Sequence, residues 1–142
     1  MKRFACCLLL LSVLSALLCL SCKNPFGYEP DDPTKTDPPA PPVQTEPEDG
    51  KLIRNYAYPQ DVVMKWQPVT GANYYQVEAY RDSTARAENL YRMVDNIRST
   101  QTSVTFGRYG WYCWRVRAYS PNWKWYTDWS PLHEFILPNP VR

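Results

Sequence analysis

The sequence predicts an all-β fold, a two-sheet β-sandwich of about seven short strands. Fourteen of the 142 residues are proline and 15% are aromatic, a composition that favours a chain broken into short elements over long helices. Several segments also alternate between apolar and polar residues, which is the period of a strand with one buried face. The elements that precede and make up this sandwich follow in chain order.

The first 21 residues have the pattern of a secretion signal. Lys2 and Arg3 precede an apolar run from Phe4 to Leu20, and small Ser21 stands before Cys22. A membrane-spanning helix is the alternative, since roughly 20 apolar residues cross a bilayer. No basic cluster follows the run, however, so cleavage and export are the favoured interpretation.

The end of this segment, Leu18-Cys19-Leu20-Ser21-Cys22, resembles the lipobox of bacterial lipoproteins, with Cys19 where Leu is usual. The resemblance implies that Cys22 carries a diacylglyceryl thioether and further acyl chains such as palmitate. Two or more chains anchor stably, so the protein would sit on a membrane of the bacterial cell envelope. Of the other cysteines, only Cys113 lies beyond the signal, which leaves no partner for an intramolecular disulfide.

Residues 22–50 are predicted to form a disordered tether behind the lipidated cysteine. Lys23 to Gly50 contains eight prolines and seven acids against two lysines, too polar to bury a core. The pairs Pro38-Pro39 and Pro41-Pro42 favour extended polyproline segments, so the predicted reach approaches about 80 Å. A docking site for an SH3-like domain is the less favoured alternative.

Residues 51–142 are predicted to form the single folded domain. They hold 12 basic and 7 acidic side chains, whereas the whole chain has a net charge of only +2, which argues against a nucleic-acid partner. The basic domain either meets acidic polysaccharide or lipid headgroups, or is simply well solvated.

Three segments of this domain predict half-buried strands, and their inward residues are Val62, Met64 and Trp66; Tyr75, Val77 and Ala79; and Tyr112, Trp114, Val116 and Ala118. Pro68 to Asn73 provides a turn after the first of them. Ser103 to Phe106 predicts another strand, and Trp129 to Leu137 predicts the last, ended by Pro138. Residues 81–101 stay undecided between a short helix and an edge strand.

The ordered motifs Val62-x-Met64-x-Trp66-x-Pro68, Gly71-Ala72-x-x-Tyr75-x-Val77, Tyr112-x-Trp114-Arg115-Val116-Arg117-Ala118 and Asp128-Trp129-Ser130 together resemble a fibronectin type III domain, an immunoglobulin-like sandwich. The resemblance implies that Trp66, Tyr75, Tyr112 and Trp114 form the structural core. It also implies that Tyr112 is a tyrosine corner, whose hydroxyl donates to backbone upstream.

Tyr126-Thr127-Asp128-Trp129-Ser130 is similar to the W-S-x-W-S element of cytokine-receptor fibronectin domains. In that family arginines of the preceding strand stack between aromatic rings, which implies a ladder of Arg115, Arg117 and Trp129. The alternative is a ligand platform, in which Trp123, Trp125 and Tyr126 stand exposed on the loop and grip a partner.

Catalysis, a metal site and a cofactor are not expected. His133 is the only histidine and lies in no motif with a nucleophile, and the chain has no glycine-rich phosphate loop. The expected function is therefore non-catalytic binding of a protein or polysaccharide partner at the cell envelope. A purely structural spacer is the runner-up, and a glycan-processing enzyme is the remote alternative.

Overall fold

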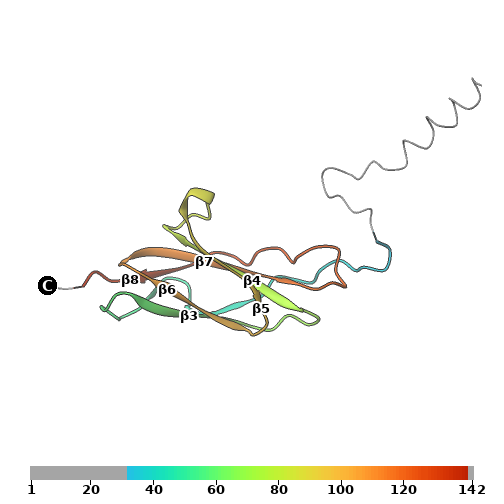
Figure 1. Cartoon of the computed structure of the whole chain (residues 1–142), viewed down its shortest axis with the longest axis horizontal. Coiled ribbons are helices and arrows are strands. Elements are labelled where there is room, and N and C mark those ends of the chain that lie inside the picture. Colours follow the sequence, from blue (N-terminus) through green and yellow to red (C-terminus); the bar gives the residue numbers. More distant parts are fainter. Residues whose placement is uncertain (1–31, 141–142) are drawn as a thin grey trace, which may run out of the picture. The chain divides into compact units, whose positions relative to one another are not determined.

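The protein is described by a computed structural model that covers residues 32–140 and forms one compact unit from Pro33 onward. The predicted signal peptide of residues 1–21 and Cys22 lie outside the described residues. Eight strands make up this part of the chain, with one short 3-10 turn at Ala87–Asn89 (Figure 1).

The smaller sheet has three antiparallel strands in the order β1-β3-β6, namely β1 (Gln44–Glu46), β3 (Gln60–Trp66) and β6 (Gln101–Phe106). The larger has five in the order β2-β8-β7-β4-β5, namely β2 (Lys51–Leu52), β8 (His133–Leu137), β7 (Gly110–Tyr119), β4 (Tyr74–Arg81) and β5 (Leu90–Ile97). Among the paired strands of the described residues only β2 and β8 run parallel, and the isolated bridge between Thr36 and Trp123 is also parallel. The predicted all-β sandwich of two sheets is confirmed.

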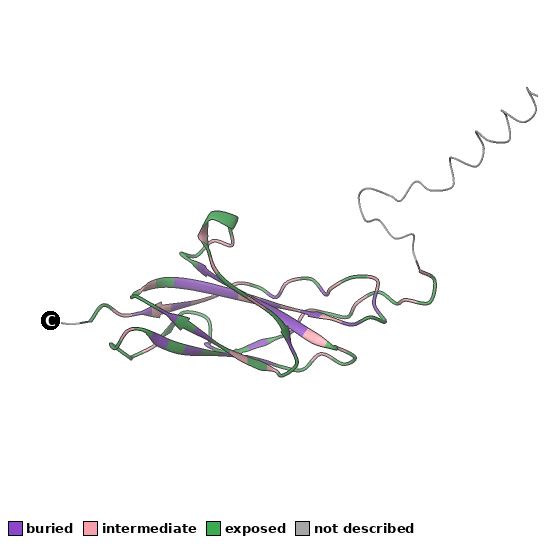
Figure 2. Cartoon of the chain, viewed as in Figure 1, coloured by how far each residue is buried: buried purple, intermediate pink, exposed green. Residues whose placement is uncertain are grey.

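The core lies between the two sheets and is built by the alternation seen in the sequence (Figure 2). Val62, Met64 and Trp66 of β3 are at most 3% exposed, whereas Val63, which points outward, is 43% exposed. Large rings fill most of the space, and the fully buried side chains include Trp114, Tyr112, Phe106, Phe135, Met64 and Leu137.

The predicted tether is wrong for the part that the structure describes, because residues 36–50 belong to the sandwich. Gln44–Glu46 pairs with β3, and Pro42 is fully buried. Near its beginning, Thr36 bridges to Trp123 in the loop after β7. The prolines predict disorder, yet proline is compatible with an extended segment that pairs at few positions, and residues 36–50 are such a segment, here called the strap.

Two further predictions are refined. The last strand begins at His133 and not at Trp129, because Pro131 interrupts the segment. The undecided segment 81–101 contains the 3-10 turn followed by β5, which forms an edge of the five-stranded sheet. Its second half is therefore an edge strand, one of the two alternatives left open.

Candidate functional site

The most distinctive surface of the molecule is the face of the five-stranded sheet that points away from the core, here called the outer face. Because side chains alternate along strands, β4 and β7 place their core residues on one side and a second set on the other. Register pairs this second set across the two strands as Tyr74 with Tyr119, Gln76 with Arg117, Glu78 with Arg115 and Tyr80 with Cys113.

Arginines and aromatic rings alternate along this face. The guanidinium carbon of Arg117 lies 4.0 Å from the ring centroid of Tyr126 and 4.4 Å from that of Trp129. The guanidinium carbon of Arg115 lies 4.4 Å from the centroid of Trp129 and 5.4 Å from that of Tyr80. The structure thus brings Arg115, Arg117 and Trp129 together in one ladder, and Tyr126 and Tyr80 extend it at its two ends.

Two hydroxyl side chains hold Trp129 in the ladder. The amide of Thr127 donates to Ala118 at 2.9 Å while its hydroxyl accepts from the Ala118 amide at 3.0 Å. Ser130 repeats this arrangement with Val116, at 2.9 Å in both directions. The hydroxyl oxygens of Thr127 and Ser130 therefore accept hydrogen bonds from β7 in place of main-chain carbonyls. These bonds fix Trp129 between the two arginines.

An ion pair with Glu78 holds Arg115 in place at its end of the ladder. Arg115 donates to one carboxylate oxygen of Glu78 from Nε at 2.9 Å and from Nη2 at 2.8 Å, and Nη2 also donates to the Tyr80 hydroxyl at 2.9 Å. The Tyr80 hydroxyl in turn donates to Glu78. Burial of the phenol, and then its hydrogen bond to Glu78, raise the pKa of Tyr80 to about 12.

Of the three residues expected to form a ligand platform, only Trp125 stands free, at 54% exposed. Trp123 contradicts the expectation because it is 6% exposed, packed in the core cluster beside Gly71. Tyr126 is half-buried, and its hydroxyl hydrogen-bonds that of Tyr74 at 2.7 Å. The Nζ of Lys124 lies 5.7 Å from the Trp125 ring centroid.

The four residues expected in the structural core all lie between the sheets. The Trp66 ring centroid is 5.3 Å from that of Tyr75 and 6.4 Å from that of Trp114. The Tyr112 hydroxyl donates to the carbonyl of Arg108 at 3.0 Å, four residues upstream, which is the geometry of a tyrosine corner. Burial raises the pKa of Tyr112 above its usual value.

Sequence reasoning missed three exposed apolar side chains on the outer face, Leu90, Met93 and Trp111, which are here together called the apolar patch. Register places Leu90 beside Tyr80, Met93 beside Glu78 and Trp111 beside Ile136, all on that face. Trp111 is 57% exposed, Met93 48% and Leu90 40%. The alternation that put Tyr112 inside also put Trp111 outside, so the signal for it was present in the sequence.

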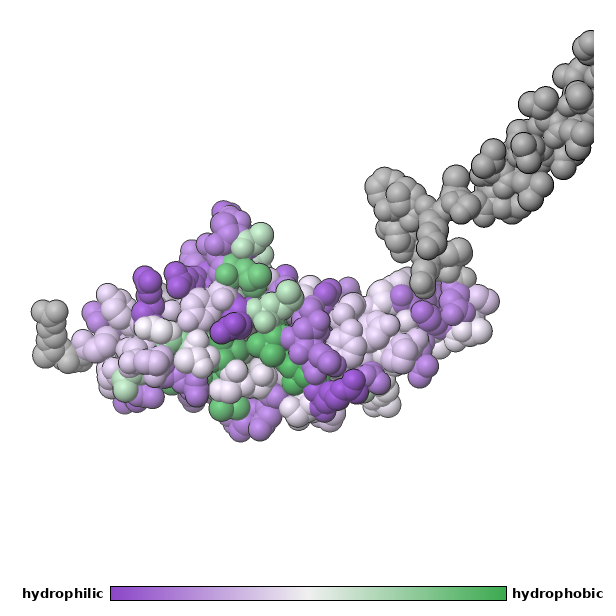
Figure 3. All heavy atoms as spheres, viewed as in Figure 1, coloured by the Kyte–Doolittle hydropathy of each residue, from purple (hydrophilic) through white to green (hydrophobic). Residues whose placement is uncertain are grey.

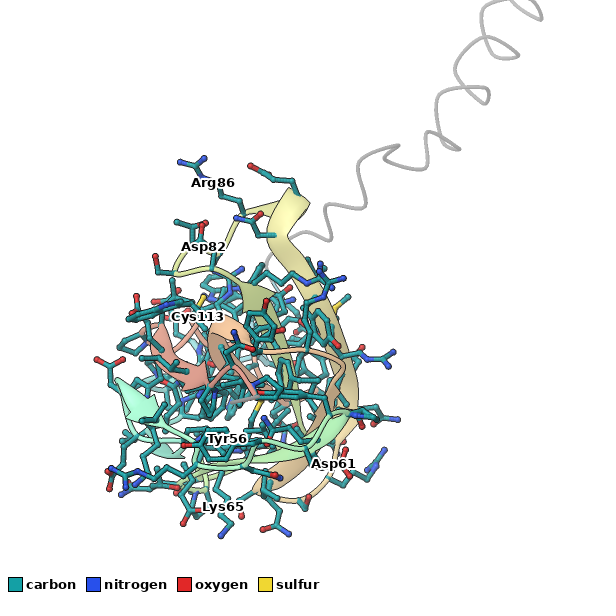
Figure 4. The ribbon with its side chains drawn as sticks, turned by 90° about the vertical axis from the view of Figure 1, so that its left-hand side faces the viewer. Tyr56, Asp61, Lys65, Asp82, Arg86 and Cys113 are labelled. Carbon is teal, nitrogen blue, oxygen red and sulfur yellow. The ribbon has the colours of Figure 1, made fainter. Side chains whose placement is uncertain are left out.

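Figure 3 shows apolar atoms over the middle of the view, where Figure 1 labels β4 and β5, with hydrophilic atoms toward both ends. By register and exposure, the described outer face combines the stacked ladder with the exposed side chains of Leu90, Met93 and Trp111. Large exposed side chains grouped on one face are typical of binding surfaces.

The groups that carry acid, base or nucleophile chemistry are dispersed or engaged. Cys113 is fully buried, and burial raises the pKa of its thiol to about 11, which keeps it protonated at neutral pH. His133 has its Nδ1 3.4 Å from the carbonyl of Pro47. Within residues 32–140 no three His, Cys, Asp or Glu side chains gather as metal ligands. The same residues include no helix long and apolar enough to cross a bilayer.

No family model matches the sequence, and no curated protein is similar to it in sequence. Solved structures do resemble the fold. An Fn3-like protein from Clostridium thermocellum is 22% identical, with 73% of this chain and 96% of that chain covered and a TM-score of 0.45. The fibronectin type-III domain of human fibronectin type III domain containing protein 3 is 15% identical, with 74% and 90% covered and a TM-score of 0.47. The fn3 domain of human collagen alpha-1(XX) chain is 18% identical, with 78% and 95% covered and a TM-score of 0.43.

Proposed function

We propose that this chain is a non-catalytic lipoprotein of the bacterial cell envelope, anchored by acylated Cys22, whose sandwich binds a protein or glycan partner. The observation that carries the binding role is the apolar patch of Trp111, Leu90 and Met93 on the outer face. Each of these side chains has 40% or more of its surface in water, whereas the inward residues Tyr112, Trp114, Val116 and Ala118 of β7 are at most 2% exposed.

The composition of the patch favours a protein partner. A sugar ring stacks on flat aromatic rings, whereas Leu90 and Met93 offer aliphatic and thioether surface that matches apolar side chains. The ladder beside the patch keeps the sheet rigid, since Arg115 is fixed by both Glu78 and Trp129. A rigid surface loses little conformational entropy on binding, which raises affinity.

Two matched variants test the binding role. The full chain, purified in detergent, is applied to arrays of envelope proteins and of glycans. We expect Met93→Glu to weaken binding to the protein array by tenfold or more, because it puts a charge into the apolar patch. Val63→Glu is the control, since Val63 is also 43% exposed but lies on β3 in the other sheet. Equal binding by both variants would contradict the proposed surface.

The anchor needs its own test. Cells are labelled with palmitate, and the membrane and soluble fractions are compared for the natural chain and for Cys22→Ser. We expect label and membrane association in the natural chain and the loss of both in the variant. An array without any bound partner, together with normal acylation, would instead support the structural spacer.

A further inference from the structure

The chain enters the sandwich at one defined end. The Thr36 amide donates to the carbonyl of Asn122 at 3.0 Å, and the Lys124 amide donates to the carbonyl of Thr36 at 3.0 Å. Asp37 and Lys124 add an ion pair at 3.2 Å. In Figure 1 the described chain begins at this end, and its C-terminal part leaves at the other. This end, with the loop after β7, is here called the entry end.

The distance from the anchor to the entry end is short. Thr36 lies only 14 positions after Cys22 in the sequence. A flexible chain of that length spans roughly 20 Å on average, and about 45 Å at full stretch. Strand β7 alone, with its ten residues, is about 33 Å long. An anchor at Cys22 therefore holds the entry end closer to the bilayer than the opposite end.

The entry end carries the side chains that suit a membrane surface. Trp125 is more than half exposed there, next to the cation of Lys124. Three tyrosines cluster at the same end, with ring centroids 5.0 Å apart for Tyr74 and Tyr119 and 4.9 Å apart for Tyr119 and Tyr126. Trp and Tyr favour the headgroup level of a bilayer, because their rings are apolar and their N–H or O–H groups stay hydrated.

We propose that the entry end rests on the phospholipid surface, with the exposed ring of Trp125 inserted among the headgroups. The sandwich then stands with its Trp111 patch directed away from the membrane, toward a partner. This inference rests on the acylated Cys22 of the proposed function. It assigns Trp125 to lipid, in place of the protein or glycan ligand expected of it from the sequence.

Quenching of tryptophan fluorescence tests the orientation. The acylated full chain is incorporated into vesicles of phosphatidylethanolamine and phosphatidylglycerol, with and without brominated acyl chains. We expect the brominated lipid to quench part of the emission, and Trp125→Phe to remove that quenchable part. Trp111→Phe is the matched control, because Trp111 is equally exposed but lies on the outer face away from the entry end.

The outcomes separate the inference from the function on which it rests. Quenching that persists in Trp125→Phe, or that disappears in Trp111→Phe, overturns the orientation while the anchor stands. A chain that takes up no palmitate and stays out of the vesicles overturns the anchor, and the orientation with it. Thermal unfolding of both variants checks that the sandwich is intact.

Discussion

The side-chain amide of Gln44 donates to the main-chain carbonyl of Trp114 at 3.0 Å, across 70 residues of sequence. Gln44 is 7% exposed and begins β1, while Trp114 lies in the middle of β7 in the other sheet. One hydrogen bond thus joins the N-terminal strap to the core and crosses from one sheet to the other.

Gln44→Ala should lower the free energy of unfolding by about 1 kcal/mol, because it removes a buried hydrogen bond between the two sheets. The measurement is the denaturant midpoint of the natural chain and the variant at unchanged slope. Gln67→Ala is the control, since the Gln67 side chain is exposed. Its main-chain N–H donates to the carbonyl of Val43, and that bond stays in the variant. A stability loss in Gln67→Ala as large as in Gln44→Ala would show that the Trp114 contact contributes nothing special.

Tyr112→Phe should lower the free energy of unfolding by about 1 kcal/mol or more, through the lost hydrogen bond to Arg108. The phenol ring itself packs against Phe106 and Phe135 and stays in place in the variant. Tyr109→Phe, which alters an exposed ring, should leave the unfolding midpoint unchanged. A Tyr112→Phe protein that unfolds at the natural midpoint would remove the tyrosine corner from the stabilising contacts.

Arg117→Met should lower the free energy of unfolding by about 0.5–2 kcal/mol, since the guanidinium stacks on both Tyr126 and Trp129 and methionine keeps only its apolar stem. Arg117 also donates to Gln76 at 2.8 Å, and that bond is lost too. Thermal unfolding of the natural chain and the variant measures this loss. Arg92→Met, at an exposed residue of the edge strand β5, is the control. Equal effects of the two substitutions would mean that stacking adds nothing to stability.

The sandwich was predictable because apolar residues recur at every second position of β3, β4 and β7, and this period decides which side chains meet in the core. Trp66, Tyr112 and Trp114 were placed correctly on that ground alone. The ladder was predictable in two steps. Arg115 and Arg117 lie two residues apart and therefore share a face, and the resemblance to the W-S-x-W-S element implied that they stack with Trp129.

The strap was not predictable, because its place depends on contacts remote in sequence. Pro42 and Gln44 look solvated by composition, and only the register with β3 and the carbonyl of Trp114 show why they are buried. The predicted exposure of Trp123 was wrong for the same reason. Its loop position suggested exposure, but Gly71 leaves room for the ring and the strap bridges to its backbone.

The last prediction concerns alkaline unfolding and Tyr80. Its pKa is raised to about 12 in the folded state, against 10.0 as its ordinary value. Below pH 10 the phenol is neutral in both states and contributes no pH dependence. Between pH 10 and 12 the unfolded chain gives up the proton while the folded chain keeps it, so the free energy of unfolding falls as pH rises.

Tyr80→Phe should therefore flatten the decline of stability across pH 10 to 12, measured as the denaturant midpoint at each pH. The decline does not vanish, since burial also raises the pKa of Tyr58 and Tyr112. Tyr56→Phe, at an exposed ring, should leave the slope as it is in the natural chain. If Tyr80→Phe and the natural chain lose stability in parallel over this range, the hydroxyl bound to Glu78 and Arg115 ionises as readily as one in water.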